Sequence, residues 1–364
     1  MNRLTAWILC SISLACTAAE PDISDLTIDQ RAERIQRLMT NWEADGASGA
    51  VLVAQHGTVV FNAGFGSASC RDEEPISPSH HFMIGSITKE FTQVLGHILQ
   101  SKGILSLSDR VSDHITGMPD QIGRITIRQL IDHTAGLPDL IDENGRPIPY
   151  SVEYDYIPTS REDLLNKLRL ARLEFEPDSD EVYSNLGYQL LAVIYELAAG
   201  SSYEQLLQQY IFEPAAMTDP GFWFEDNAQR EFADGCRFAN EHWGNPIDDD
   251  MWDEAGASWN LKGAGGLLST TASLARFFTA LGNHQLFDAE SDSVAYKNSR
   301  MVFSNRRGQL VMGPAGSNGI FNAVAFWMDG DELVLIMITN RAEHPAEGGM
   351  FSELLGLFPA SPPA

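Results

Sequence analysis

Short apolar and β-branched runs near both ends of the chain predict paired strands. Val51-Leu52-Val53-Ala54 and Thr58-Val59-Val60-Phe61 flank Gln55-His56-Gly57, a pattern typical of a β-hairpin. Near the other end, residues 323–328 and 333–339 flank Asp329-Gly330-Asp331, which predicts a second hairpin with an Asp-Gly turn.

Between these hairpins the apolar positions recur at helical spacing. One run extends from Leu186 to Gly200, and another follows a Ser269/Thr270 cap and ends at Gly282. A third opens at Ser86 and ends at Lys102-Gly103, with an apolar face made of Ile87, Phe91, Val94, Leu95, Ile98 and Leu99.

This order of elements predicts the fold class. Strands at both ends with helices between them predict an α+β, two-lobed fold. An antiparallel sheet from the N- and C-terminal segments would be flanked by helices, and the central residues would form a mostly helical lobe. We expect the active cleft between the two lobes.

The N-terminal residues predict export. Arg3 precedes a mostly apolar stretch, and Thr17-Ala18-Ala19 offers small residues for cleavage, so residues 1–19 are interpreted as a signal peptide. Lipidation at Cys16 is the less favoured alternative. We then expect an extension at 20–30, a folded domain at 31–357 and a tail at 358–364, in the periplasm or secreted.

The net charge limits the classes of binding partner that we expect. The formal net charge is −26, and loss of Arg3 with the signal peptide makes it one unit more negative. Nucleic-acid binding needs a positive surface, so DNA and RNA are excluded as partners. The apolar run of the leader is too short to span a bilayer, so stable membrane insertion is not expected.

Two cysteines remain in the mature chain. Cys70 and Cys236 are either a disulfide or two buried free thiols, and both alternatives stay open. Neither has the neighbours of a metal site, and no His-Glu-x-x-His occurs. We expect no metal and no cofactor.

Candidate chemistry begins at Ser86-Ile87-Thr88-Lys89, the only Ser-x-x-Lys in the chain. Residues three apart on a helix share a face, so Lys89 lies beside the Ser86 hydroxyl. Serine needs a base to act as a nucleophile, and a desolvated lysine amine is suitable. The alternative is an N-cap serine with a surface lysine on an ordinary amphipathic helix.

A second candidate segment is Tyr183-Ser184-Asn185, directly before the Leu186–Gly200 run. A tyrosinate near a lysine and a helix N-terminus can handle protons, and Asn185 can bind a substrate carbonyl or hold Lys89. Tyr296-Lys297-Asn298 and Ser258-Trp259-Asn260 fit similar patterns. The neighbouring turn and helix signals favour Tyr183.

Together these blocks resemble the serine β-lactamase-related family, which includes class C β-lactamases, D-alanyl-D-alanine carboxypeptidases, D-aminopeptidases and family VIII esterases. The resemblance covers about residues 31–357 and includes residues 82–89, 125–137, 183–191, 263–270 and 316–319. It implies a β-lactamase/transpeptidase-like fold, an acyl-enzyme on Ser86, and Lys89 and Tyr183 as proton-handling partners. It also implies an oxyanion hole from the Ser86 and Ser317 N–H groups, with Gly316 in the strand that lines the cleft.

The chain departs from this family at its third motif. Where relatives carry Lys-Thr-Gly or His-x-Gly, this chain has Pro314-Ala315-Gly316. Proline has no charge and no N–H, so it cannot pair with a substrate carboxylate. Arg341, after the last predicted strand, is a candidate replacement for the missing positive charge.

The sequence thus predicts a serine hydrolase that acts on small esters, amides or peptides rather than an efficient β-lactamase. Catalysis would use Ser86, Lys89 and Tyr183, and substrate would contact Asn185, Gly316 and Ser317. The alternative is a weakly active, receptor-like or penicillin-binding-like protein that has lost the third-motif cation. His133 is interpreted as structural, and the oligomeric state stays open.

Overall fold

The computed structural model describes most of the chain beyond the predicted leader. The described residues are 23, 26–151, 154, 157–222, 230–237, 241–244, 258–287, 302–304, 310–329, 332–341 and 347–358. The predicted signal peptide, Gly330 and Asp331 of the second hairpin turn, and the rival segment at Tyr296 lie outside them.

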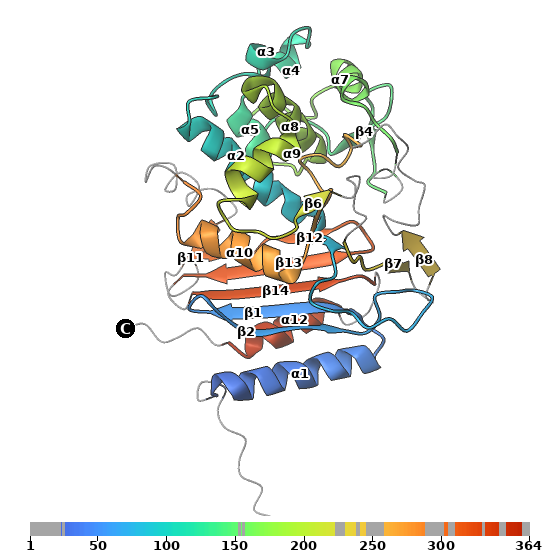
Figure 1. Ribbon diagram of the computed structural model, residues 1–364. Coiled ribbons are helices and arrows are strands. Elements are labelled where there is room, and N and C mark those ends of the chain that lie inside the picture. Colours follow the sequence, from blue (N-terminus) through green and yellow to red (C-terminus); the bar gives the residue numbers. More distant parts are fainter. Residues whose placement is uncertain are drawn as a thin grey trace, which may run out of the picture.

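A seven-stranded antiparallel sheet forms one lobe (Figure 1). Its strand order is β10-β11-β13-β14-β1-β2, and β12 pairs with β13 off this path. The strands are β1 (Gly49–Gln55), β2 (Thr58–Phe65), β10 (Val302–Ser304), β11 (Leu310–Met312), β12 (Ala315–Ser317), β13 (Asn322–Met328) and β14 (Leu333–Thr339). Because β1 pairs with β14, the two ends of the chain close one sheet, and the predicted fold class is confirmed.

Both faces of the central strands are buried, and successive side chains of β1 pack into two different hydrophobic cores. Val51 and Val53 pack with α1 (Ile28–Ala44) and α12 (Glu347–Gly356) on one face, whereas Leu52 points into the larger core. Side chains alternate across a strand, which produces this division. Figure 1 shows α1 and α12 below the sheet and α10 (Thr271–Gly282) above it.

Turn and cap residues set the ends of several elements as predicted. His56 and Gly57 have φ of 51° and 71° and close the β1–β2 hairpin. The Thr270 side chain caps α10, and Gly200, with φ of 67°, ends α8 (Asn185–Ala199) in the left-handed region. The helix α1 begins at Ile28, inside the segment expected to be an extension.

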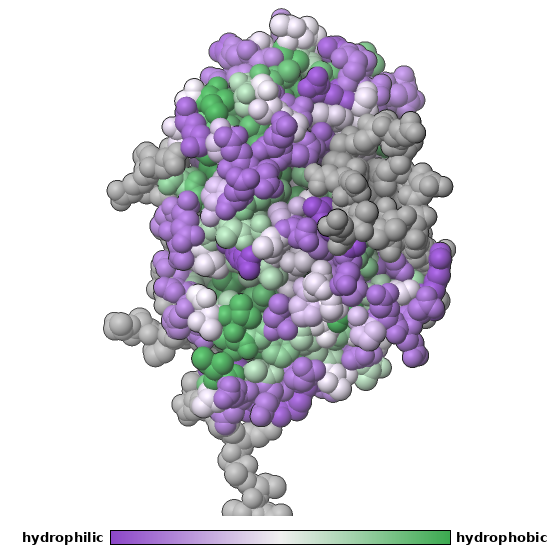
Figure 2. Space-filling view, viewed as in Figure 1, coloured by the Kyte–Doolittle hydropathy of each residue, from purple (hydrophilic) through white to green (hydrophobic). Residues whose placement is uncertain are grey.

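The second lobe consists mainly of helices packed around α8. Its helices are α2 (Thr88–Ser101), α3 (Val111–His114), α4 (Asp120–Gly123), α5 (Ile127–Ile131), α7 (Arg161–Leu170), α8, α9 (Tyr203–Leu207) and the π-helical turn η3 (Gln208–Phe212). Every residue of α8 from Leu186 to Tyr195 is buried, so this helix is the centre of the lobe. Figure 2 shows that hydrophilic side chains predominate on the outside of the lobe in this view.

The described residues also form three small sheets. One has the order β3-β9-β6, one pairs β4 with β5, and one pairs β7 with β8. Their strands are β3 (Phe82–Met83), β4 (Leu140–Ile141), β5 (Pro147–Ile148), β6 (Gly221–Phe222), β7 (Gly235–Arg237), β8 (Glu241–Gly244) and β9 (Leu267–Ser269). The strand β3 leads directly into the Ser86 segment.

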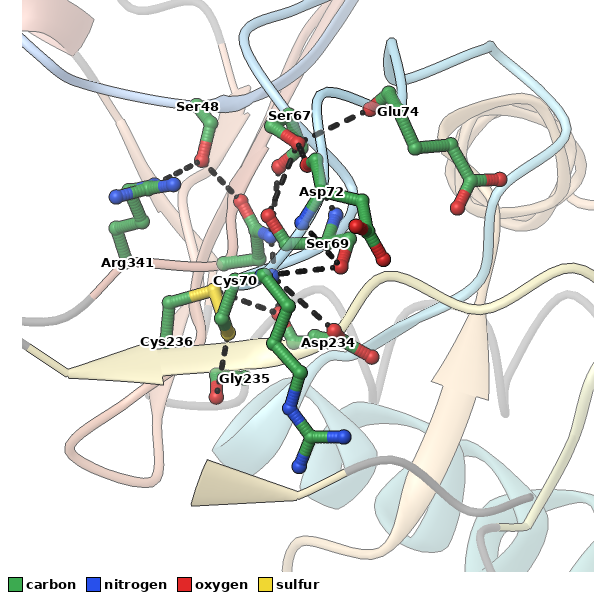
Figure 3. Close-up of a disulfide and its surroundings, with 12 residues drawn as sticks. Ser48, Ser67, Ser69, Cys70, Asp72, Glu74, Asp234, Gly235, Cys236 and Arg341 are labelled. Carbon is green, nitrogen blue, oxygen red and sulfur yellow. Dashed lines mark hydrogen bonds between the residues drawn. A yellow bond between two sulfur atoms is a disulfide. The ribbon is translucent and has the colours of Figure 1, made fainter. Parts of the chain in front are cut away.

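Cys70 and Cys236 form a disulfide, which settles the alternative that the sequence left open (Figure 3). The bond joins the segment after β2 to β7, and the two Cα atoms are 5.6 Å apart. Asp234 Oδ2 accepts the Cys70 N–H at 3.1 Å, and the Asp234 carbonyl accepts from Asn340 Nδ2 at 2.9 Å. The disulfide therefore belongs to a hydrogen-bonded junction between β7 and the end of β14.

In the described part of the chain, no helix combines the length and apolar character needed to cross a membrane. Within the same residues, no group of three or more His, Cys, Asp or Glu side chains is arranged to hold a metal ion.

Burial of the His97 imidazole is expected to make the folded protein less stable at acid pH. Burial in α2, helped by the charge of Arg128, lowers the pKa of His97 to about 4. The unfolded chain, with a histidine pKa of about 6.5, then binds a proton that the folded chain excludes. We expect the free energy of unfolding to fall as the pH drops from 6.5 to 4, by up to about 3 kcal/mol from this group.

Urea denaturation between pH 7 and pH 4.5 measures this effect. His97→Gln removes the titrating group and should flatten the pH dependence. The control is His56→Asn, at the exposed β1–β2 turn, where asparagine tolerates the positive φ. Equal slopes for the His97→Gln variant and the wild-type protein would refute the assignment.

Candidate active site

Ser86 lies in a short 3₁₀ turn rather than in the helix that follows. The turn η2 (Gly85–Ile87) follows β3, and α2 begins only at Thr88. Gly85 has a φ of 51°, which turns the chain sharply before the serine. The N-cap position of α2 is Ile87, without a side-chain cap, so the N-cap interpretation of Ser86 is wrong.

Lys89 is buried beneath Ser86, with only 2% of its surface exposed. Its Nζ lies 3.3 Å from Ser86 Oγ and 2.6 Å from both Asn185 Oδ1 and the Ala264 carbonyl oxygen. Burying an ammonium group is costly unless acceptors surround it, and these three atoms supply that compensation. The surface-lysine alternative is therefore also wrong.

Tyr183 completes the group from the segment that leads into α8. Its hydroxyl lies 2.7 Å from Ser86 Oγ and 3.3 Å from Asn185 Oδ1, and Lys89 Nζ is 4.9 Å from the ring centroid. The Ser184 side chain caps α8, so Tyr183 stands directly before the helix and Asn185 is its first residue. The four side chains predicted from the sequence thus converge.

A second tyrosine near Lys89 has a different role. Tyr188 is fully buried on α8, and its hydroxyl donates to the Ile131 carbonyl at 3.0 Å. Burial, with the nearby Glu90 carboxylate, raises the pKa of Tyr188 well above its usual value. This phenol stays protonated, which leaves Tyr183 as the tyrosine that can exchange a proton with Ser86.

The register of β12 shows where its backbone N–H groups point. The Ala325 N–H donates to the Pro314 carbonyl at 3.0 Å, and hydrogen-bonded positions alternate along an antiparallel pair. Gly316 is then hydrogen-bonded to β13, whereas Ser317, opposite Asn322, is not. The Ser317 N–H is therefore directed away from β13.

That outer edge of β12 packs against the turn that carries Ser86. A Cβ at Gly85 would lie 2.7 Å from Ser317 N, and a Cβ at Gly316 would lie 2.8 Å from Ser86 N and overlap the Ile84 carbonyl oxygen. Only glycine fits at either position. The close approach brings the two backbone N–H groups proposed as an oxyanion hole to the same gap.

A cavity of about 190 Å³ opens beside these groups. Its lining residues come from both lobes: Gly85, Ser86, Asp139, Leu140, Tyr150, Tyr183, Asn185, Asn260, Leu261, Ala264, Gly265, Ser317 and Asn318. Among these lining residues, Asp139 carries the one charged side chain. The Tyr150 hydroxyl donates to the Asn318 carbonyl at 3.3 Å and so bridges the lobes across the cavity.

Arg341 does not replace the missing third-motif cation. Its Nε donates to Ser48 Oγ at 3.1 Å beside the disulfide, and it is not among the residues that line the cavity (Figure 3). The parallel bridge between Arg341 and Cys236 holds the residue in that junction. The sequence showed only that Arg341 follows the last strand.

Sequence reasoning missed three contributors to the site. The Ala264 carbonyl is a backbone atom, which residue identity does not reveal, and Tyr150 lies in a segment without a recognisable motif. Asp139 follows Pro138 at the end of the recognised 125–137 block, and its Oδ1 accepts two hydrogen bonds from Asn185. No local sequence signal could have found it, because the α8 residue that it binds lies 46 residues further along the chain.

His133 and the Ser258-Trp259-Asn260 segment have mainly structural contacts. His133 Nδ1 accepts the Ser184 N–H at 3.1 Å, and its ring lies 4.8 Å from that of Tyr183. In the Ser258-Trp259-Asn260 segment, Asn260 lines the cavity. Ser258 Oγ instead donates to the Ile157 carbonyl at 2.9 Å.

Gly316→Ala tests the contact between β12 and η2. The new methyl group would force the strand away from Ser86 and separate the two N–H groups that are expected to form an oxyanion hole. We expect kcat/KM for an ester to fall by about 10²-fold, the usual effect of losing one donor. The matched control is Gly349→Ala in α12, where a Cβ meets nothing within 4 Å; equal activities of the two variants would contradict the interpretation.

Comparison with known proteins agrees with this geometry. The Beta-lactamase family model matches residues 31–351. Penicillin-binding protein 4* of Bacillus subtilis (strain 168) is 36% identical over 175 residues, 47% of this chain and 37% of that protein. The chain therefore aligns with little more than a third of this relative's length.

Two other similarities extend over most of the chain. The putative penicillin-binding protein PbpX of the same strain is 24% identical over 311 residues, 85% of this chain and 74% of that protein. A class C β-lactamase structure superposes with a TM-score of 0.73 at 16% identity, covering 93% of this chain and 99% of that one. The chain belongs to the Beta-lactamase family, a family of serine hydrolases, and has the β-lactamase/transpeptidase-like fold.

Proposed function

We propose that this protein is an exported serine hydrolase that forms an acyl-enzyme on Ser86. The observation that carries the proposal is the position of Ser86 Oγ, 2.7 Å from the Tyr183 hydroxyl and 3.3 Å from Lys89 Nζ at a cavity wall. A serine within hydrogen-bonding reach of proton acceptors is the arrangement that nucleophilic catalysis requires.

The reaction follows from these contacts. Tyr183, with Lys89 beside it, takes the Ser86 proton as Oγ attacks the substrate carbonyl carbon. The Ser86 and Ser317 N–H groups stabilise the resulting oxyanion. The bond to the leaving group breaks as that group receives the proton, and an acyl ester remains on Ser86. Water then attacks this ester, giving up one proton to the same groups, and Ser86 recovers its hydrogen as the acid departs.

The preferred substrate is a small neutral ester or amide. Pro314 offers no cation to a substrate carboxylate. Among the described residues that line the cavity, Asp139 carries a carboxylate and none carries a basic side chain. The acidic chain as a whole disfavours anions further. β-Lactams that carry a carboxylate should therefore bind poorly.

Export is the second part of the proposal. The predicted leader at 1–19 supports it, as does the Cys70–Cys236 disulfide, because disulfides persist mainly in oxidising compartments. A small-molecule or peptide substrate is then met outside the cytoplasm.

A substrate comparison tests the proposed activity. We expect p-nitrophenyl acetate to be hydrolysed faster than nitrocefin, and intact-mass spectrometry to show a fluorophosphonate adduct on Ser86. Ser86→Ala should abolish both, whereas Ser101→Ala, at the far end of α2, should change neither. Efficient nitrocefin turnover with negligible ester hydrolysis would refute the substrate preference. Ligand binding without labelling would indicate the receptor-like alternative.

Tyr150 should limit the size of the acyl group. Its side chain bridges to Asn318 across the cavity, so Tyr150→Ala should open this side. We expect the ratio of kcat/KM for p-nitrophenyl hexanoate over p-nitrophenyl acetate to rise by about tenfold, the scale of added methylene contacts in an apolar pocket. Tyr210→Ala, away from the cavity lining, is the control; an unchanged ratio in the Tyr150 variant would show that another group sets the limit.

A further inference from the structure

The turn from His133 to Asp139 holds the segment that carries Tyr183 and Asn185. The Val182 N–H donates to the His133 carbonyl at 3.1 Å, and the Leu186 N–H donates to the Asp139 carbonyl at 3.0 Å. These contacts bracket the second catalytic segment on both sides. The turn therefore fixes where the segment lies before any side chain of the site is considered.

The Asp139 side chain adds a more specific constraint. Its Oδ1 accepts both the backbone N–H and the side-chain Nδ2 of Asn185, each at 2.9 Å. A single carboxylate oxygen thus ties the amide group of Asn185 to the first turn of α8. An amide that donates through Nδ2 on one side must present its carbonyl oxygen on the other.

That carbonyl oxygen is the acceptor for the proton-handling groups. Asn185 Oδ1 lies 2.6 Å from Lys89 Nζ and 3.3 Å from the Tyr183 hydroxyl. With the amide reversed, Nδ2 would face the Lys89 amine, and two donors would oppose each other. The orientation imposed by Asp139 therefore decides whether Lys89 is held beside Ser86.

We propose that Asp139 is a positioning residue for the reaction, which fixes the Asn185 amide so that its carbonyl holds Lys89 next to Ser86. This inference rests on the proposed acyl-enzyme function. Asp139 also accepts hydrogen bonds at the N-terminus of α8, so a purely structural role as a helix cap is the alternative. The two roles differ in whether the effect of Asp139 on rate depends on the Asn185 side chain.

A double-mutant cycle separates these roles. The variants are Asp139→Leu, Asn185→Ala and the double variant, with Asp139→Asn as the matched control that keeps an acceptor oxygen. The measurement is the rate of fluorophosphonate labelling of Ser86 by intact-mass spectrometry, together with kcat and KM for p-nitrophenyl acetate. Thermal unfolding of each variant reports the structural cost independently.

We expect Asp139→Leu to slow labelling by about 10²-fold, the scale of a small displacement of a catalytic group. The fall should appear in kcat with little change in KM, and Asp139→Asn, which keeps an acceptor oxygen, should recover most of the rate that Asp139→Leu loses. The double variant should be no slower than Asn185→Ala alone, since Asp139 acts through that side chain.

The opposite results overturn the inference. Multiplicative losses in the double variant, or losses that follow the melting temperature in all four variants, would make Asp139 a helix cap and no more. If the wild-type protein is not labelled at all, the proposed function fails, and the positioning role falls with it. If the wild-type protein is labelled but the rate losses of the two single variants multiply in the double variant, the proposed function stands and only the positioning role of Asp139 is refuted.

Discussion

The buried amine of Lys89 is the constraint on which the site depends. A charged group with 2% exposure persists only if acceptors replace water around it. Here the acceptors come from three separate segments: the η2 turn at Ser86, the start of α8 at Asn185, and the turn at Ala264. Each segment must therefore lie within hydrogen-bonding distance of the amine, and satisfying the amine brings the reactive groups together at the same time.

A second constraint is the backbone contact between β12 and η2. Glycine at 85 and at 316 lets a strand of the sheet approach the nucleophile turn more closely than any side chain would permit. The same contact places the Ser86 and Ser317 N–H groups at the cavity, so donor geometry comes from main-chain packing. The absence of a third-motif cation at Pro314 leaves this proposed oxyanion hole intact, because it uses no side chain of that residue.

Local sequence patterns determined much of the fold. Continuous apolar and β-branched runs specified β1 and β14, the His56-Gly57 turn closed the first hairpin, and Gly200 ended α8 in a conformation that suits glycine. The Ser86–Lys89 spacing correctly indicated that the hydroxyl and the amine are neighbours. These features depend on interactions within a few residues, where spacing and intrinsic preference act directly. Even there, Ser86 was expected at the helix start, whereas Gly85 inserts a 3₁₀ turn.

Contacts between distant segments were decided by tertiary packing alone. No local pattern encodes four of these contacts. They are the Cys70–Cys236 disulfide and the hydrogen bonds of Lys89 to the Ala264 carbonyl, of Asn185 to Asp139 and of Arg341 to Ser48. Tyr183 was selected by its context, yet its distance from Ser86 depends on how the helical lobe meets the sheet. Sequence therefore supplied the reactive groups and their local frames. The folded chain supplied their convergence, since only packing of both lobes fixes atoms that lie 97 residues apart.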